Sequence, residues 1–411
     1  MDDSPNAGTE GSAAHVLLLP SWYPTELNPV NGIFFREQAH ALRRHAGLRV
    51  GVVAPVQRGV RTLRDGGIGG YRFQVDEEMD GGVPTLRVRG WAVPRAPALN
   101  RRLWLAMARR ALRRYVGQYG RPDLIHAHSA LSAGWPAGVL GREWGIPYVV
   151  TEHTSLYAEG RITPEQVPPI RQAFAGASRV IAVSRALAAD LAPYAGDTPV
   201  EVVPNLVDTD FFTLPATPRG TEPFRFLTIA LFDDVKATDV LLRAFAAGFR
   251  GRPDVVLEIG GGGPLRPSLQ ALAGELGIAE QVRWRGVLTR EGVRRAMWDA
   301  CAFVLSSHVE TFGVAVVEAM ATGLPVVSTA CGGPQDTVAP GTGLLVPPGD
   351  PAALAQAMES VRADYPLWAA RAGVIRGHAQ AGFAQPVVAA RLRELYDVVL
   401  RERAGGASSR T

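Results

Sequence analysis

The chain has 411 residues, of which 47% are apolar and 20% are charged, a composition that supports buried cores and excludes a disordered, collagen-like or coiled-coil protein. Its length is about 2.7 times that of a typical domain, so two domains are expected. The 43 Lys and Arg residues exceed the 39 Asp and Glu residues by four. This surplus fits an anionic ligand but is too small to imply a nucleic-acid partner.

Neither cysteine is placed to predict a disulfide framework or a zinc site. Cys301 and Cys331 lie in apolar or glycine-rich segments without a C-x-x-C partner. The N-terminal segment begins acidic and polar, unlike a signal peptide, and no apolar run reaches membrane-spanning length. We therefore expect a cytoplasmic protein without a cysteine-based zinc site.

Short β-branched or leucine-rich runs alternate with longer amphipathic segments, which is the pattern of parallel α/β units. In the first half, strands are predicted near 15–19, 48–53, 85–89, 123–127, 147–151, 179–183 and 200–203. Helices are predicted near 33–46, 98–118, 134–144, 164–176 and 184–194. Ser184 is the predicted N-cap of the last of these helices.

The alternation restarts after a proline-rich segment that we interpret as a linker. Strands are then predicted near 224–231, 254–259, 281–285, 301–306, 324–329 and 343–346. Helices are predicted near 237–249, 264–276, 289–300, 313–322 and 351–363.

The predicted organisation is a domain at 13–207, a linker at 208–223, a domain at 224–383, a closing helix at 384–402, and disordered tails at 1–12 and 403–411. Both domains are expected to be Rossmann-like, doubly wound parallel sheets. Ligands of such sheets bind at the carboxyl ends of the strands, so the site is expected in a cleft between the domains.

Gly32 follows the predicted strand HVLLL at a strand–loop–helix junction. The helix that begins after it offers free N–H groups and a partial positive charge, which suit a phosphate. A plain turn before a helix is the alternative.

Three histidines lie at the carboxyl ends of neighbouring strands. Alternation places His126 and His128 on the same face, toward the rim of the cleft, and His153 ends the next strand. They either form part of a polar site or are hydrogen-bonded core residues, and a metal would need further ligands.

Four consecutive glycines, Gly260 to Gly263, precede Pro264 at a predicted helix start. Glycines let a backbone approach a ligand closely. The segment is not a dinucleotide fingerprint, because Leu265 stands where that pattern requires glycine. A tight turn without a ligand explains it equally well.

The segment ETFGVAVVEAM carries the most specific pattern. Glu310 precedes a turn, and Glu318 lies inside the helix that begins near Gly313. A carboxylate can accept hydrogen bonds from two adjacent sugar or ribose hydroxyls, while the N–H groups of Phe312, Gly313 and Val314 can meet oxygens. The apolar neighbours of Glu318 argue against a solvated surface glutamate.

Lys236 lies just before a predicted helix of the second domain. A loop lysine is usually solvated. One that follows the first strand of a nucleotide-facing sheet could instead neutralise a leaving phosphate.

The helix at 101–116 separates into two arcs at helical spacing. One arc holds Arg102, Arg109, Arg110, Arg113 and Arg114, and the other holds Trp104, Ala108, Ala111, Leu112 and Tyr115. A surface helix packed on its sheet explains this pattern. Attraction to anionic lipid or to a polyanionic acceptor is the alternative.

Taken in order, these segments resemble the retaining glycosyltransferases of family 4. The resemblance rests on PSWYP…NGIF, HAH, TEH, VIAVS, VVPNLVD, GGGP, ETFGVAVVEAM and GTGLLVPPGD, from about His15 to Tyr396. It implies a GT-B fold of two Rossmann-like domains, with a UDP- or GDP-sugar in the second domain and the acceptor in the first.

The resemblance also implies a role for each motif residue of the second domain. Glu318 would bind the ribose hydroxyls. Glu310, with the backbone of Phe312, Gly313 and Val314, would hold the donor sugar.

Other roles implied by the resemblance extend to both domains. Lys236 would take the diphosphate, together with the backbone at Gly32. Gly263 is placed among the donor-binding residues, and His128 near the reacting sugar and the acceptor.

The sequence departs from the family pattern before Lys236. Leu231 stands where an arginine is usual, and Ala237 replaces a glycine. One of two expected cations is therefore missing, and each charge-assisted contact is worth roughly 1.5–3 kcal/mol. Either another group compensates, with Arg36 or Arg266 as candidates, or turnover is slow, or the fold is kept without catalysis.

The implied reaction transfers a sugar from a nucleotide-diphosphate sugar to a hydroxyl of a glycan or lipid-linked acceptor, with retention of configuration and without a metal or other cofactor. Polysaccharide or glycolipid biosynthesis in the cytoplasm is the expected setting, and the alternative explanation of the basic helix at 101–116 would add peripheral association with the inner face of an anionic membrane. The alternatives are a GT-B sugar-nucleotide epimerase or phosphorylase, or a non-catalytic nucleotide-sugar-binding subunit.

Overall fold

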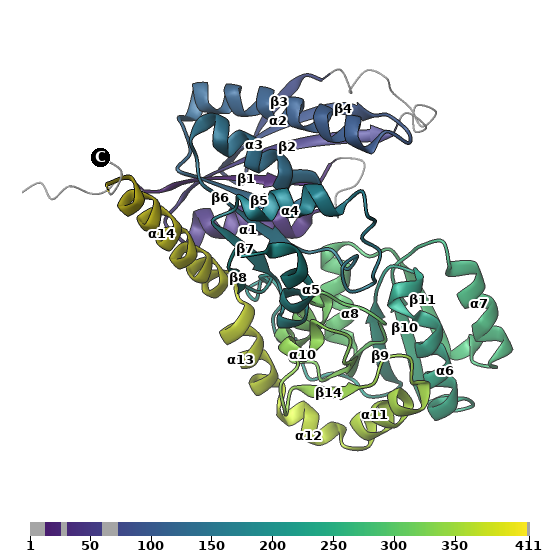
Figure 1. Ribbon diagram of the computed structural model, residues 1–411. Helices are drawn as coiled ribbons and strands as arrows, with labels where there is room; N and C mark the ends of the chain where they lie inside the picture. Colours follow the sequence, from purple (N-terminus) through teal and green to yellow (C-terminus); the bar gives the residue numbers. More distant parts are fainter. Residues whose placement is uncertain (1–12, 26–30, 60–72, 409–411) are drawn as a thin grey trace, which may run out of the picture.

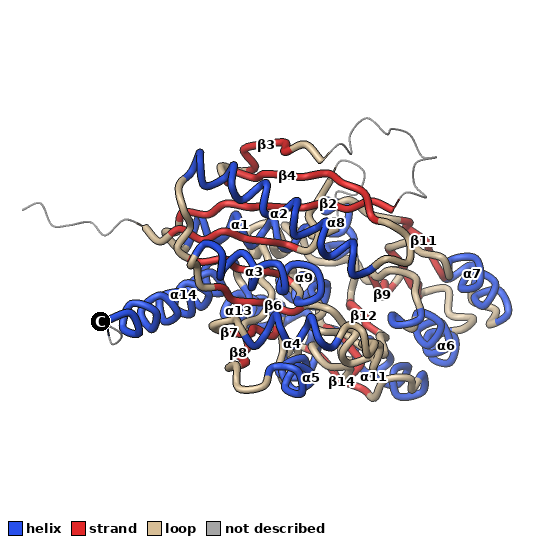
Figure 2. Tube along the Cα trace, turned by 45° about the horizontal axis from the view of Figure 1, so that its top comes forward, coloured by secondary structure: helices blue, strands red, loops and turns tan. Residues whose placement is uncertain are grey.

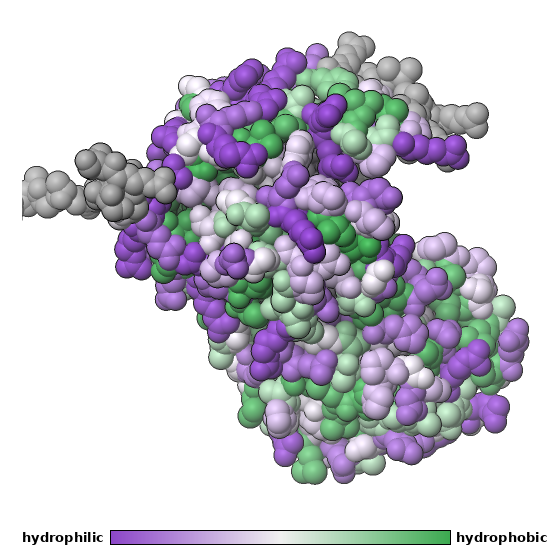
Figure 3. All heavy atoms as spheres, viewed as in Figure 1, coloured by the Kyte–Doolittle hydropathy of each residue, from purple (hydrophilic) through white to green (hydrophobic). Residues whose placement is uncertain are grey.

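Buried runs of Val, Leu and Ile form two separate sheets in the computed structural model, which describes residues 13–25, 31–59 and 73–408. Each sheet carries helices on both faces, and the two domains stack end to end (Figure 1). The space-filling surface is indented between the two lobes, on the side of β11 and α7 (Figure 3).

The N-terminal sheet has the strand order β3-β4-β2-β1-β5-β6-β7-β8, and every pairing except β3–β4 is parallel. Its strands are β1 (His15–Pro20), β2 (Arg49–Gly59), β3 (Val75–Asp80), β4 (Val83–Ala92), β5 (Leu124–His128), β6 (Tyr148–Glu152), β7 (Arg179–Ala182) and β8 (Val200–Val202). The antiparallel β3 lies at the outer edge of this sheet (Figure 2).

Helices cover both faces of the N-terminal sheet. They are α1 (Ile33–His45), α2 (Pro97–Tyr119), α3 (Trp135–Trp144), α4 (Val167–Ala175) and α5 (Arg185–Ala195), and a π-helical turn at Ala130–Gly134 precedes α3. Alternate residues of β1 enter different cores: Leu17 packs in the core that contains α2, and Val16 in the core that contains α1. The predicted N-cap is confirmed, since the Ser184 hydroxyl accepts a hydrogen bond from the N–H of Leu187.

The C-terminal sheet is parallel throughout, with the order β11-β10-β9-β12-β13-β14. Its strands are β9 (Phe224–Ile229), β10 (Val255–Gly260), β11 (Val282–Gly286), β12 (Ala302–Leu305), β13 (Val326–Thr329) and β14 (Gly343–Val346). Its helices are α6 (Thr238–Phe249), α7 (Arg266–Glu275), α8 (Arg290–Asp299), α9 (Val314–Ala321), α10 (Pro334–Thr337), α11 (Pro351–Ala363), α12 (Tyr365–Ala370) and α13 (Ala372–Phe383). Among them, α6 packs against α7 and α11, and α9 packs against α13.

The last helix, α14 (Gln385–Ser408), returns from the C-terminal domain to the N-terminal one (Figure 1). Leu392 and Tyr396 are buried in the same core as Phe35 of α1 and Val16 of β1. The two places where the chain passes between the domains lie side by side, because Val207 pairs with Ala384.

Most elements lie within a few residues of their predicted positions, and the differences have local causes. The strand β3 was not predicted because its sequence, VDEEMD, is largely acidic and lies at a sheet edge. The prediction of a disordered tail is wrong for residues 403–408, since α14 continues to Ser408 and its one proline, Pro386, lies in the first turn, where proline is tolerated. The predicted tails at 1–12 and 409–411 lie outside the described residues.

The two arcs predicted for the basic helix are confirmed in α2. Its apolar arc, Trp104, Ala108, Ala111, Leu112 and Tyr115, is buried against the sheet. Of the arginines, Arg109 pairs with Glu143 and Arg114 with Glu77, across the surface. No helix within the described ranges is long and apolar enough to cross a bilayer.

Candidate active site

An ion pair between Lys236 and Glu310 lies at the carboxyl ends of the C-terminal strands. Lys236 ends a 3-10 turn after β9, and Asp233 caps that turn by accepting the N–H of Lys236. Glu310 follows β12, and its carboxylate Oε2 lies 2.6 Å from the Lys236 Nζ. Burial opposes the ammonium charge, but the adjacent Glu310 carboxylate outweighs it and raises the pKa of Lys236. Lys236 is therefore charged at neutral pH.

Lys236 is the only lysine in the whole sequence, so every other one of the 43 Lys and Arg residues is arginine. Arginine and lysine differ in physical character: arginine is a planar fork, whereas lysine is a compact point charge. A chain that uses arginine at every other cationic position retains an ammonium only at this site.

The loop that carries Glu310 presents free backbone donors. The N–H of Glu310 donates to the carbonyl of Cys331, and the carbonyl of Glu310 accepts from the N–H of Gly333. Within the described part of the chain, the N–H groups of Phe312, Gly313 and Val314 donate to no acceptor. These groups open α9, where a helix N-terminus attracts negative charge.

Glu318 lies half-buried on α9 and faces the other domain. Burial raises the pKa of its carboxyl to about 8, and the Glu37 carboxylate of α1 adds to this shift, while Arg290 opposes it. The Nη2 atom of Arg290 lies 2.9 Å from Glu37 and 3.1 Å from Asp208. Glu318 therefore shares its surroundings with charges from both domains.

Two of the predicted donor-site glycines cannot be replaced without strain. Gly32 precedes α1 with a φ of 79°, and a Cβ there would lie 2.9 Å from the backbone oxygen of Trp22. A Cβ on Gly263 would lie 2.5 Å from the backbone oxygen of Phe232. Both turns thus need glycine because the chain itself packs closely there, as the tight-turn alternative expects, and the approach of a ligand to these glycines stays a prediction.

The predicted position of His126 at the rim of the cleft is wrong. Its ring stacks 4.2 Å from that of His128, so both lie on the same face, but both side chains are fully buried. The Nδ1 atom of His126 hydrogen-bonds Tyr396 of α14 and Nε2 hydrogen-bonds Thr151. His126 is therefore a core residue that joins α14 to the N-terminal sheet.

His128 and His153 form a buried pair beside the Glu310 loop. The Nδ1 atom of His128 lies 3.1 Å from Nε2 of His153, and Nε2 of His128 has no partner among the described residues. Burial lowers the pKa of His128 well below its ordinary value and that of His153 to about 3. The Thr311 hydroxyl donates to the His153 carbonyl at 3.0 Å, which joins the two domains here. The pair is uncharged at neutral pH.

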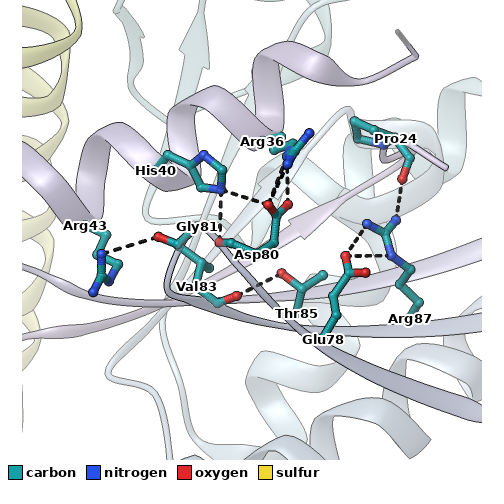
Figure 4. Close-up of polar contacts among 10 residues, drawn as sticks. All are labelled: Pro24, Arg36, His40, Arg43, Glu78, Asp80, Gly81, Val83, Thr85 and Arg87. Atoms are coloured by element: carbon teal, nitrogen blue, oxygen red, sulfur yellow. Dashed lines mark hydrogen bonds and ion pairs between the residues drawn. The ribbon is translucent and has the colours of Figure 1, made fainter. Parts of the chain in front are cut away.

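One of the two candidates to replace the cation missing at Leu231 is already held in another ion pair. Arg36 binds Asp80 through two nitrogens, with Nη2 lying 2.7 Å from Oδ1 (Figure 4). Arg266 begins α7, next to the Gly263 turn, and forms no ion pair with any described residue. Leu231 itself is 65% exposed at the end of β9.

Both cysteines are buried and unpaired, which confirms that the chain has no disulfide between Cys301 and Cys331. In the described ranges, no group of three or more His, Cys, Asp or Glu side chains is placed to hold a metal ion. The absence of a metal requirement stays a prediction.

Sequence comparison connects this arrangement to known proteins. Residues 32–211 match the family model Glycosyltransferase Family 4, and residues 223–364 match Glycosyl transferases group 1. The D-inositol 3-phosphate glycosyltransferase of Streptomyces scabiei is 32% identical over 314 residues, 69% of this chain and 69% of that protein. The enzyme of the same name from Streptomyces avermitilis is 37% identical over 286 residues, 62% of this chain and 60% of that protein.

Solved structures share the fold over nearly the whole chain. Sucrose-phosphate synthase from Thermosynechococcus elongatus matches with a TM-score of 0.77 at 23% identity, covering 95% of this chain and 100% of that one. HepE of Anabaena, in complex with UDP-glucose, matches with a TM-score of 0.70 at 19% identity, covering 93% and 99%. At these identities the likeness bears on the fold alone. The two family matches and the relatives together show that the chain belongs to glycosyltransferase family 4 and is a glycosyltransferase with the GT-B fold.

Proposed function

We propose that the protein transfers a sugar from a UDP- or GDP-sugar to a hydroxyl of a glycan or lipid-linked acceptor, with retention of configuration. The observation that carries this proposal is the Lys236–Glu310 ion pair beside the unpaired N–H groups of Phe312 to Val314. An ammonium and free amides suit a pyrophosphate, and a carboxylate suits sugar hydroxyls. The solved structure of HepE in complex with UDP-glucose supports a nucleotide sugar as donor.

Each proposed contact follows from the chemistry of the residue. Glu318 accepts hydrogen bonds from the two ribose hydroxyls, and Glu310 accepts them from the donor sugar. Lys236 moves from Glu310 to the diphosphate, with the backbone at Gly32 and Gly263 lining the phosphate path. The site thus exchanges its internal ion pair for contacts to the donor, so Lys236 never lacks a counter-charge.

The reaction breaks the bond between the anomeric carbon and the β-phosphate oxygen. The acceptor oxygen attacks the same face, and its proton passes to the departing phosphate oxygen. Negative charge therefore develops on the phosphate, where Lys236 and the amides of α9 stabilise it. His128, which is uncharged, orients the hydroxyl or the sugar by hydrogen bonding. The proposal requires no metal or other cofactor.

The single lysine permits a direct test of the donor site. Reductive methylation labels ε-amino groups, so in this chain the only side chain it can modify is Lys236. Saturating UDP should protect Lys236 from labelling, as measured by mass spectrometry of the peptide that contains it. The α-amino group of the same molecule is an internal control and should label equally with and without UDP. Equal labelling of Lys236 under both conditions, with UDP and GDP alike, would refute the proposed diphosphate contact.

The exposed Leu231 favours a second candidate, a non-catalytic subunit that binds a nucleotide sugar. With only Lys236 as a side-chain cation, donor binding without transfer would also be consistent with the site. The spacing of Glu310 and Glu318, eight residues apart, fits a nucleotide-sugar epimerase or phosphorylase less well. UDP release that depends on an added acceptor would remove the non-catalytic alternative.

The exposed arginines of α2 carry a separate proposal, peripheral binding to an anionic membrane at its cytoplasmic face. Arg102, Arg110 and Arg113 point to solvent, and hydrophilic side chains gather over the upper lobe (Figure 3). Flotation with vesicles of phosphatidylglycerol should recover the protein at low salt, and vesicles of phosphatidylcholine should not. Recovery that ignores lipid charge, or that survives replacement of these arginines by glutamine, would refute it.

A further inference from the structure

A charged pocket of about 280 Å³ lies in the N-terminal domain, between α1 and the hairpin of β3 and β4. Figure 4 shows the side chains of α1 and of the two strands turned toward one another across it. None of the roles proposed above uses this pocket.

Two ion pairs fix the wall of the pocket. Arg36 of α1 binds Asp80 of β3 through Nε and Nη2, and the Asp80 side chain is only 8% exposed. Arg87 of β4 binds Glu78 through Nε at 3.1 Å and Nη2 at 2.5 Å, and it also donates to the carbonyl of Pro24. The Arg87 side chain is 10% exposed. Paired planar groups such as these are rigid and already oriented.

In each pair one partner is shielded and the other is partly exposed: Asp80 (8%) with Arg36 (41%), and Arg87 (10%) with Glu78 (48%). The network also leaves hydrogen-bonding capacity facing the pocket. The described bonds of Arg36 occupy Nε and Nη2, which leaves Nη1 as a donor, and those of Glu78 use only Oε1, which leaves Oε2 as an acceptor. A ligand that both donates and accepts hydrogen bonds would satisfy both groups.

Sugar hydroxyls have that dual character, whereas phosphate and carboxylate groups only accept when ionised. An anion in the pocket would also face the Asp80 and Glu78 carboxylates. Met79 lies at the rim and is 61% exposed, which provides an apolar surface for the C–H face of a sugar ring. Three arginines also line the pocket, but each already has a carboxylate partner: Arg36 with Asp80, Arg87 with Glu78, and Arg89 with Asp76. The lining therefore suits a neutral sugar better than an anion.

The pocket lining is connected along the chain to residues that contact the buried histidine pair, although neither histidine lines the pocket. The Ser21 hydroxyl donates to the His128 carbonyl at 2.5 Å, and Pro24, three residues later, lines the pocket. The ring of Phe35 lies 4.6 Å from that of His128, and the next residue, Arg36, lines the pocket. The loop after β1 and the first turn of α1 thus link the pocket to the surroundings of His128.

We propose that this pocket binds one neutral sugar unit of a glycan acceptor, adjacent to the unit that receives the new sugar. This rests on the proposed function and narrows its acceptor to an oligosaccharide of two or more units. Glu78 and Arg89 are the residues to test, because both line the pocket and are partly exposed. Replacing Arg89 spares both pairs, whereas Glu78→Gln removes the charge from the pair with Arg87 but keeps a side-chain oxygen that can accept from it.

The test uses the full-length protein on a printed array of mono- and oligosaccharides. The wild type should bind neutral glycans of at least two units, and Glu78→Gln and Arg89→Gln should each lower apparent affinity about tenfold, the loss expected for one charge-assisted hydrogen bond. Arg171→Gln, at an exposed position of α4 outside the pocket, is the matched control and should bind as the wild type does. Each variant is first checked for unchanged thermal unfolding.

The proposal is overturned if the wild type binds no glycan, if it binds only sulfated or phosphorylated glycans, or if both pocket variants bind as the wild type does. Stabilisation by UDP-glucose and by GDP-mannose is measured in parallel by thermal shift. If neither nucleotide sugar stabilises the wild type, the proposed donor site is wrong. The array result then still tests whether the pocket binds a glycan.

Discussion

The two domains bring groups of opposite electrical character to their boundary. On the C-terminal side, Lys236 and Glu310 form a charged pair that remains partly exposed. On the N-terminal side, His128 and His153 form a fully buried pair that burial keeps uncharged. The comparison indicates a division of labour: one side changes its charge contacts when phosphate departs, and the other orients a hydroxyl without adding charge.

Removing the ammonium group of Lys236 should cause the largest loss of activity among these variants. Lys236→Met is expected to lower kcat by about 10²–10³-fold, because the leaving phosphate loses its only proposed side-chain cation. The rate of UDP or GDP release is measured with the nucleotide sugar that a thermal-shift screen selects. Arg110→Met on α2 is the control. A loss of less than about threefold in Lys236→Met would mean that the amides alone carry the phosphate charge.

The pH dependence of donor binding should come from the charged side alone. Burial raises the pKa of Glu318 to about 8, so the carboxyl is protonated at pH 6.5 and ionised at pH 8.5. Ribose hydroxyls donate to the ionised form, so affinity for the nucleotide sugar should rise about tenfold over that range. His128 and His153 do not titrate there, because burial lowers the pKa of each.

Calorimetry across this pH range measures the effect. Glu318→Gln should abolish the slope, since an amide does not titrate. A flat profile in the wild type, or a slope that persists in the variant, would assign the pH dependence to another group.

Restoring a second cation should sharpen the contrast between the two sides. Leu231→Arg places a guanidinium at an exposed position, where it should raise donor affinity by up to about tenfold through one charge-assisted contact. Leu231→Gln is the uncharged control and should have no such effect. An Arg variant that binds no better would indicate that another group, such as Arg266, already compensates.

The smallest expected effect lies at the contact that joins the two sides. Thr311→Val removes the hydrogen bond to the His153 carbonyl and should lower kcat about two- to tenfold, as expected for one neutral hydrogen bond. Donor affinity should stay unchanged, because the hydroxyl touches neither proposed ribose nor phosphate contact. Thr311→Ser keeps the donor and should restore the rate. Equal losses in both variants would point to packing rather than to the hydrogen bond.

Sequence periodicity predicted the elements well where one face of a strand or helix is apolar. The burial of both faces of β1 and of one face of α2 follows directly from their side-chain patterns. The edge strand β3 was missed because its acidic residues carry no such pattern, and with it the pocket that Asp80 lines. Local hydrophobic patterns indicate which residues are buried, and most residues of β3 are exposed.

The candidate site could be predicted from sequence where its residues are local. Glu310 and Glu318 lie on one loop and the helix that follows it, so their spacing alone places both after β12. The partners of the histidines could not be predicted in this way. Tyr396 reaches His126 across 270 residues, and nothing near either residue in sequence indicates that contact. Such contacts depend on how α14 docks, which is a property of the whole fold.

The return of α14 to the N-terminal domain constrains the order in which the protein can fold on the ribosome. The helix is synthesised only after the whole C-terminal domain, yet it covers one face of the first sheet with Leu392 and Tyr396. Until then, Val16 and Phe35 lack part of their apolar cover, so the nascent first domain exposes an apolar, aggregation-prone surface. The core of the N-terminal domain is thus fully covered only when α14 has been synthesised. Until then, its exposed apolar face is the surface that a nascent-chain chaperone would bind.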